Sequence, residues 1–237
     1  MTTCKNCNAS ISENYCPNCG EPAKLKRIDR HYIIHEIEHV LHFEKGILYT
    51  IKELLVRPGQ NVRTFVSENR SRLVKPILFI IVSSLIYSVI MHFFHIKDGY
   101  VALSTKEEST TTLIFNWIQN NYGYANIVIG IFIALWLKLF FRKYKYNFFE
   151  ILILLCFIMG IGMLVFSVFA IIEGLTQISL MQVSSIITLV YFSWAIGQFF
   201  EGKAVNYIKA LIAYILGMVT FAFSAIFLGL LVDLIKQ

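Results

Sequence analysis

The sequence contains few charged residues and few prolines. Only 15% of its 237 residues are charged and four are proline, whereas 57% are hydrophobic. An ordinary soluble domain carries about 25% charged residues. The composition therefore excludes a soluble globular protein.

Long apolar runs follow Pro76. A helix rises about 1.5 Å per residue, so roughly 20 apolar residues cross a bilayer core about 30 Å thick. Five runs meet this requirement, and they predict an all-α polytopic membrane protein with five transmembrane helices. The predicted spans are residues 76–96, 125–141, 148–172, 178–200 and 206–234. The last is read as a single long helix that tilts or protrudes.

The distribution of Lys and Arg predicts the orientation of these spans. Twelve of the twenty-one precede Pro76. With a cytoplasmic N-terminus, eighteen fall on the cytoplasmic side and three outside. Because cytoplasmic loops are enriched in Lys and Arg, we expect the N-terminus inside and the C-terminus outside.

The predicted spans lack ionisable residues near their centres. Such residues are expensive in a bilayer and usually mark a transport path or a proton relay. The polar residues that remain are mostly serines of the first and fourth spans. They serve either helix packing or a path for a neutral substrate. In the long loop before the second span, residues 110–120 predict a short helix with Phe115, Trp117 and Ile118 at the membrane interface. A lid or a partner-binding site is the alternative interpretation of this helix.

The strongest motif lies at the N-terminus, in residues 1–22. Cys4 and Cys7 form one C-x2-C pair, and Cys16 and Cys19 form a second, with eight residues between the pairs. Each pair can present two thiolates to one metal ion, so the two together predict a closed Cys4 zinc ribbon. Disulfides are disfavoured in the reducing cytoplasm, and the βαβ context of a redox motif is absent. We interpret Cys156, inside a span, as an apolar packing residue.

A helical arm, residues 23–75, is expected between the ribbon and the spans. His31, His35, His39 and His42 recur at helical spacing beside an apolar stripe. The main interpretation is an amphipathic helix on the bilayer surface or against the bundle, and a pH-sensing role is an alternative. The string from His35 through Glu36 to His39 also matches H-E-x-x-H, the motif of zinc proteases, but no third ligand is identifiable.

The end of the arm is basic. We expect Arg57–Pro58–Gly59 to stop the amphipathic helix, and Arg63, Arg70, Arg72 and Lys75 follow it. Such a cluster beside a membrane attracts anionic lipid headgroups. With only Phe65 available for base stacking, we expect no nucleic acid partner.

Several segments together resemble an uncharacterised bacterial family of zinc-ribbon membrane proteins, a domain-of-unknown-function family. The matching residues are 15–20, which contain the second cysteine pair, then 44–50 and 54–59, and finally the stretch from Asn69 and Arg70 to Pro76. The resemblance implies a zinc ribbon and the bacterial inner membrane, without a known activity. By topology alone the chain is also similar to the five-span Yip-type trafficking proteins.

These features predict a non-enzymatic scaffold or adaptor that docks a protein partner, or a second copy of itself, through the ribbon and the arm. A transporter or channel for a neutral or lipid-like substrate is the first alternative, and a membrane metalloprotease using His35, Glu36 and His39 is the second. A cavity between the first and fourth spans would favour transport.

Overall fold

The computed structural model describes residues 2–3, 7, 9–11, 15–19, 46–96 and 109–236. The chain divides into two units, Met1–Glu44 and Lys45–Gln237. In the first unit, β1 (Thr2–Thr3) pairs antiparallel with β2 (Ser10–Ile11). Residues 17–19 form a turn.

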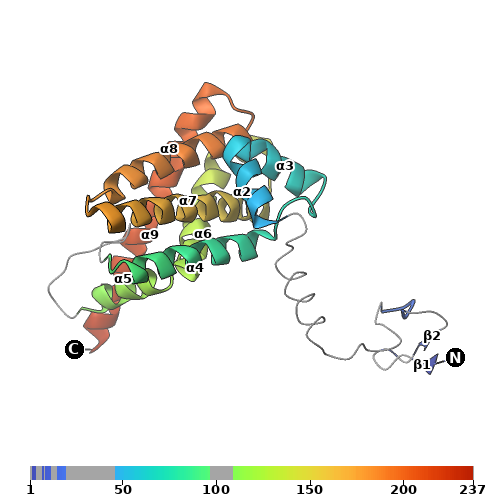
Figure 1. Ribbon diagram of the computed structural model, residues 1–237, viewed down its shortest axis with the longest axis horizontal. Coiled ribbons are helices and arrows are strands. Elements are labelled where there is room, and N and C mark those ends of the chain that lie inside the picture. The colour runs from blue at the N-terminus through green and yellow to red at the C-terminus, as the bar shows by residue number, and fades with distance from the viewer. Residues whose placement is uncertain are drawn as a thin grey trace. The chain divides into compact units, whose positions relative to one another are not determined.

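The second unit is helical (Figure 1). Four of its helices are long and apolar enough to cross a membrane, so the protein is a multi-pass helical membrane protein. The helices are α2 (Ile47–Val56), α3 (Pro58–Ser67), α4 (Pro76–Phe93), α5 (Thr110–Asn120), α6 (Tyr122–Phe140), the short 3-10 helix η1 (Arg142–Tyr144), α7 (Phe148–Thr176), α8 (Met181–Phe199) and α9 (Ala204–Lys236).

The four apolar helices are α4, α6, α7 and α9. The fourth predicted span, residues 178–200, forms α8, which has 19 residues and is not among the four. The difference from the five expected spans comes from composition, because α8 is rich in polar side chains: Gln182, Ser184, Ser185, Thr188, Ser193 and Gln198. The last apolar run is one 33-residue helix, α9, as predicted.

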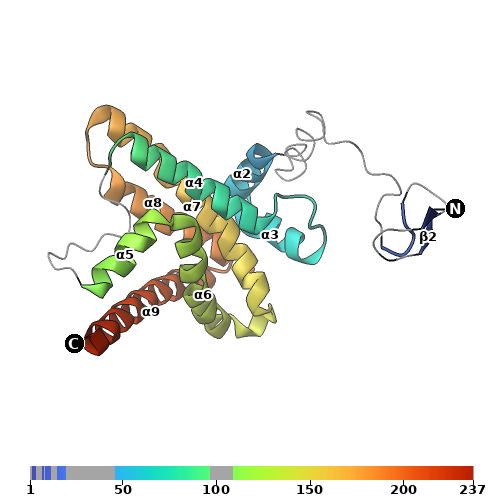
Figure 2. The ribbon, with the colours of Figure 1, turned by 90° about the horizontal axis from the view of Figure 1, so that it is seen from below.

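Helix α7 is the centre of the membrane unit. In its most apolar stretch 72% of the residues are buried inside the protein, against 17% for α9. It lies between α4 and α8 (Figures 1 and 2). Phe157 of α7 is fully buried and packs against both Phe65 of α3 and Phe79 of α4.

Local sequence explains where α7 begins and ends. Asn147 accepts a hydrogen bond from the Glu150 backbone N–H, and the Glu150 carboxylate accepts one from the Asn147 N–H. This capping box satisfies N–H groups that the first turn leaves unpaired. The helix therefore starts at Phe148, as predicted, and it ends where Gln177 adopts a left-handed conformation with φ of 61°.

Helices α6 and α9 approach each other closely at Gly217. A Cβ atom at this glycine would lie 2.6 Å from the Cα atom of Ile133. No side chain fits in that space, so glycine is needed there. Small residues at helix crossings let backbones approach within a membrane.

The contacts between helix ends define two ends of the membrane unit. At the first, Phe141 after α6 stacks on Phe200 after α8, with ring centroids 3.9 Å apart. At the second, Phe94 after α4 lies against Gly174 near the end of α7. The α6–α7 and α8–α9 connections thus lie at the first end, and the α7–α8 connection lies at the second.

Helix α5 confirms the short helix predicted at residues 110–120. Its environment differs from the prediction, because Phe115 and Ile118 are 4% and 2% exposed and belong to the protein core. Trp117 is half exposed. The protein therefore covers Phe115 and Ile118, whereas Leu113 and Trp117 stay exposed.

Candidate functional site

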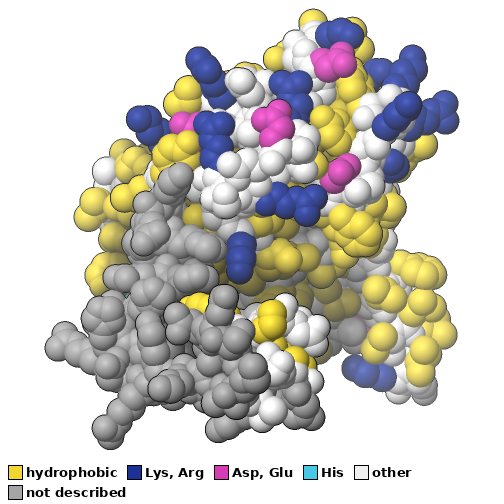
Figure 3. Space-filling view, turned by 90° about the vertical axis from the view of Figure 1, so that its right-hand side faces the viewer, with side chains coloured by type: hydrophobic (Ala, Val, Ile, Leu, Met, Phe, Trp, Pro, Cys, Tyr) yellow, Lys and Arg dark blue, Asp and Glu magenta, His cyan; other side chains and the backbone are white. Residues whose placement is uncertain are grey.

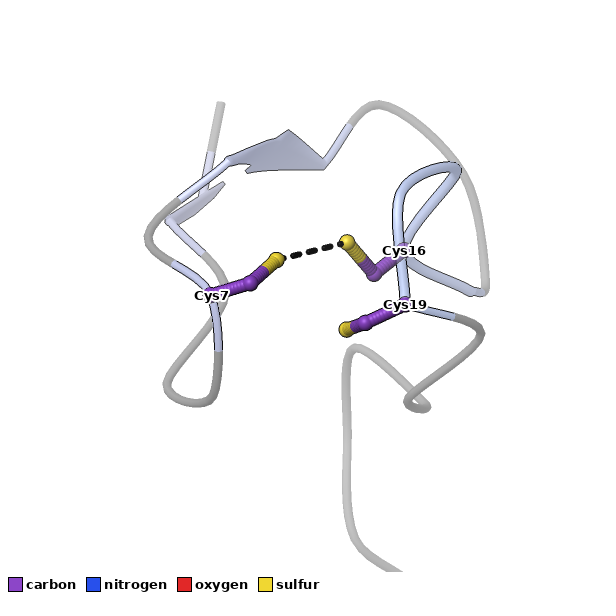
Figure 4. A group of neighbouring side chains, drawn as sticks. All are labelled: Cys7, Cys16 and Cys19. Atoms are coloured by element: carbon purple, nitrogen blue, oxygen red, sulfur yellow. Dashed lines mark hydrogen bonds between the residues drawn. The ribbon is translucent and has the colours of Figure 1, made fainter.

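Three of the four predicted metal ligands lie together in the N-terminal unit. The Sγ atoms of Cys7, Cys16 and Cys19 all lie within 4.8 Å of one another, and those of Cys7 and Cys16 are 3.5 Å apart (Figure 4). Sulfur ligands about 2.3 Å from a tetrahedral zinc ion lie about 3.8 Å from each other. The spacing of the three thiols fits a single metal ion.

The surroundings of these thiols favour the metal-binding form. Cys16 is buried, while Cys19 is exposed. A hydrogen bond with the backbone of Ala9, followed by those with the thiols of Cys19 and Cys16, lowers the pKa of Cys7 to about 6. Because the thiolate is the species that binds metals, Cys7 is ready to bind one at neutral pH.

Some predicted site residues lie outside the described residues. Cys4 is one, and its role as the fourth ligand remains a prediction. The others are the arm residues His31, His35, Glu36, His39 and His42. The protease and pH-sensing interpretations depend on these residues and also remain predictions.

The second part of the arm, from residue 46 onward, is described, and it has a defined internal structure. The Thr50 hydroxyl of α2 is buried and accepts a hydrogen bond from the Val74 backbone N–H. Arg72 forms an ion pair with Glu53 at 2.9 Å and donates to the Tyr49 hydroxyl. These bonds fold the link before α4 back onto α2.

The turn between α2 and α3 follows from the motif Arg57–Pro58–Gly59. Helix α2 ends at Val56, as predicted, and Pro58 takes the first position of α3. Proline suits this position because the first N–H groups of a helix have no intrahelical partner. Asn61 then donates a hydrogen bond to the Glu53 carbonyl, which ties the two helices together.

The turn between α2 and α3 packs against helix α8. The Gly59 N–H donates to Gln198 Oε1 at 2.9 Å, and the Tyr191 hydroxyl donates to the Leu54 carbonyl at 3.1 Å. A Cβ at Gly59 would lie only 2.2 Å from the backbone nitrogen of Phe199. No local sequence pattern predicts Tyr191 as a partner of the arm, because the contact joins residues 137 apart in the chain.

A basic surface surrounds the first end of the membrane unit. Figure 3 shows Lys and Arg side chains gathered over one part of the molecule. Among the described residues, the basic side chains of residues 52–75, the 142–145 segment and the α8–α9 connection belong to this end, and Lys236 lies near the second. The exposed ones include Lys52, Arg57, Arg70, Lys75, Arg142, Lys143, Lys145 and Lys203.

The comparisons with known proteins place a family match on the segment just described. Residues 44–88 match the family described as "Protein of unknown function (DUF3667)", and the match covers α2, α3 and most of α4. No curated protein and no solved structure matches the chain. The match includes the 44–50, 54–59 and 69–76 segments of the predicted resemblance, but not the cysteines of residues 1–22. The similarity to Yip-type proteins remains a prediction. The chain thus carries, at residues 44–88, a DUF3667 domain of unknown function.

Proposed function

We propose that the protein is a non-enzymatic membrane adaptor, in which an N-terminal zinc ribbon on the cytoplasmic side of a bacterial inner membrane docks a protein partner. The observation that carries this proposal is the cluster of Cys7, Cys16 and Cys19 in a unit of its own. Cys4 supplies the fourth thiolate. A site closed by four protein ligands leaves no coordination position for a substrate, so its role is structural.

A metal ion also explains how so short a segment folds. The described apolar cluster of the N-terminal unit is Cys16 with Cys7 and Ala9. Such a small cluster contributes little stability, whereas structural zinc contributes on the order of 10 kcal/mol or more in zinc-finger peptides. The zinc-bound ribbon would present exposed side chains such as Tyr15 to a partner.

The membrane unit would anchor this module with five spans, the N-terminus inside and the C-terminus outside. Nineteen residues give α8 a length of about 28 Å, close to the thickness of a bilayer core. It exposes Ile186 and Val190, which are 65% and 63% exposed and suited to lipid. The basic first end would face the cytoplasm, where Lys and Arg are enriched and attract anionic headgroups.

Metal content tests the proposal directly. The full-length protein in detergent should contain one zinc per chain, and Cys16→Ser should lose it. Cys156→Ser is the matched control, because this cysteine lies in α7 and is not a member of the group formed by Cys7, Cys16 and Cys19. Zinc should also remain in the variant with both His35→Ala and His39→Ala. A second zinc lost with these histidines would contradict the adaptor and support the protease. Zinc retained in Cys16→Ser would contradict the ribbon.

Docking needs a separate experiment. Tyr15, 66% exposed, can be replaced by the photoreactive residue benzoylphenylalanine in cells. The adaptor predicts a discrete cross-linked partner that disappears when Cys16→Ser is added. The same replacement at Trp117, exposed on α5, should not capture that partner. Cross-links that are equal with and without the zinc ligand would argue against docking by the ribbon.

A further inference from the structure

A cavity of about 170 Å³ lies between α6, α7, α8 and α9. The first span, α4, does not line it, so it differs from a path between the first and fourth predicted spans. Most of its lining is apolar. The lining residues are Asn126, Ile129, Met159, Met163, Phe166, Ser185, Thr188, Leu189, Phe192, Tyr214 and Met218.

The cavity lies near the middle of the membrane helices. Met159 and Met163 lie about halfway along α7, and Leu189 lies about halfway along α8. The half-buried residues of the lining all belong to α8 and α9. These two helices therefore form the side of the cavity nearest to the lipid.

One polar atom in the lining has no protein partner. The Thr188 side chain is 2% exposed, and its hydroxyl makes no hydrogen bond. The neighbouring hydroxyls of Ser184 and Ser185 both donate to the Met181 carbonyl. A buried hydroxyl without a partner is unfavourable. A bound molecule that forms a hydrogen bond with the Thr188 hydroxyl would remove this cost.

The packing around Thr188 fixes its orientation. Its Cγ2 methyl faces α7, where a Cβ on Gly162 would lie 3.0 Å from it and 2.5 Å from Phe192. With the methyl group held against α7, the rotamer of Thr188 is fixed. The hydroxyl therefore has a defined direction in which to meet a ligand.

The cavity has the size and the walls for one small ring. An engineered apolar cavity of about 150 Å³ binds benzene, and this one is slightly larger. Phe192 and Tyr214 form an aromatic wall, with ring centroids 5.0 Å apart. The lining contains no Lys, Arg, His, Asp or Glu. A charged ligand would have no counter-ion there.

We propose that this cavity binds a small neutral molecule with an apolar body the size of an aromatic ring and one oxygen that hydrogen-bonds to the Thr188 hydroxyl. The site is independent of the zinc ribbon, so it would add ligand binding within the membrane to a protein that docks a partner outside it.

Photolabelling of the full-length protein in detergent tests the site. The probes are 4-azidophenol and phenyl azide, which differ by the hydroxyl alone, and peptide mass spectrometry identifies the labelled residues. In the wild type, 4-azidophenol should label cavity-lining residues of α7, α8 and α9 about fivefold more efficiently than phenyl azide, as expected for one hydrogen bond. An excess of phenol should protect these residues.

Thr188→Val keeps the shape of the side chain and removes the hydroxyl. It should reduce labelling by 4-azidophenol about fivefold and leave labelling by phenyl azide unchanged. The second probe therefore reports whether the cavity is still intact in this variant. Thr176→Val is the matched control, because that hydroxyl lies at the end of α7 and is bonded to the Ile172 carbonyl.

A variant that fills the cavity completes the experiment. Leu189→Trp should abolish labelling of the lining by both probes. Equal labelling of wild type by the two probes would overturn the role of Thr188. Labelling spread over lipid-facing residues, without protection by phenol, would overturn the site itself.

Discussion

At the scale of single residues, the cysteine cluster shows how a few atoms determine the chemistry of a segment. Cys7 lies among hydrogen bonds that lower the pKa of its thiol to about 6. Two of these involve the other cysteines of the cluster, so the thiols that would share a metal also favour its bound form. The spacing of the cysteines predicts this convergence, whereas the bond from Ala9 was visible only in the structure.

This pKa gives a pH prediction for the metal-free protein. A lowered pKa means that the Cys7 thiolate is present above pH 6 and is lost as the pH falls through 6. Alkylation of Cys7 by iodoacetamide, followed by mass spectrometry, should therefore speed up between pH 5 and 7 and then level off. An ordinary cysteine, with a pKa near 8.5, would still be gaining rate at pH 8. That behaviour at Cys7 would contradict the prediction.

Gly59 provides a second test at this scale. A Cβ at this position would lie 2.2 Å from the Phe199 nitrogen, so Gly59→Ala must push α3 away from α8. Overpacking of this kind typically costs about 1–3 kcal/mol, and the loss would appear as a lower unfolding temperature in detergent.

Gly123→Ala is the matched control, because the nearest atom to its added Cβ is 3.7 Å away. Alanine is also the better helix former, by about 1 kcal/mol. The control should be as stable as the wild type or more so. If both variants unfold alike, the close packing of Gly59 is not important for stability.

At the scale of elements, the helices were largely predictable and their partners were not. Apolar runs and turn residues such as Pro58 are local signals, and they located α7 and the end of α2. The bond between Gly59 and Gln198 joins residues 139 positions apart, and no local pattern encodes such a pairing. The burial of Phe115 was missed for the same reason, because it depends on the packing of α5 against α6 and α9.

One contact between elements allows a precise test. The Thr110 N–H at the start of α5 donates to both carboxylate oxygens of Asp233 in α9, at 3.2 and 3.1 Å. A negative charge at a helix N-terminus contributes about 0.3–1 kcal/mol. Asp233→Asn should therefore speed up hydrogen exchange of the α5 amides about two- to fivefold.

The control for this exchange experiment is Glu173→Gln. Glu173 accepts a hydrogen bond from the Leu180 N–H in the α7–α8 connection, so its substitution should leave α5 unchanged. Equal exchange of α5 in wild type and Asp233→Asn would show that the carboxylate does not hold this helix.

At the scale of the whole molecule, composition alone indicated a multi-pass membrane protein, and the structure agrees. The number of spans depends on α8. Its polar side chains lower its mean hydropathy, so hydropathy alone does not decide whether this helix crosses the membrane. Many of those side chains make bonds within the protein: Ser193 donates to the Tyr207 carbonyl, and Gln198 accepts from Gly59. Polar groups satisfied in this way are compatible with a membrane span.

Cysteine reporters can decide the topology. If α8 spans the membrane, Ser179→Cys in the α7–α8 connection should react with an impermeant maleimide in intact cells. Lys203→Cys, beyond the other end of α8, should react only after lysis. The unsubstituted protein gives the background from native cysteines, and peptide mass spectrometry assigns each label. Reaction of both positions on the same side would exclude α8 as a span.

The hydrogen bond between Gly59 and Gln198 also forms late during synthesis of the protein, because Gly59 is translated well before Gln198. A ribosome adds about 5–20 residues per second, so the 139 positions that separate the two residues take about 7 to 28 s to translate. Throughout that interval α2 and α3 exist without α8, the helix to which they are hydrogen-bonded. Residues 44–88, which match the DUF3667 model, are thus among the first parts of the membrane unit to be made. Their helices α2 and α3 are among the last to reach their final position.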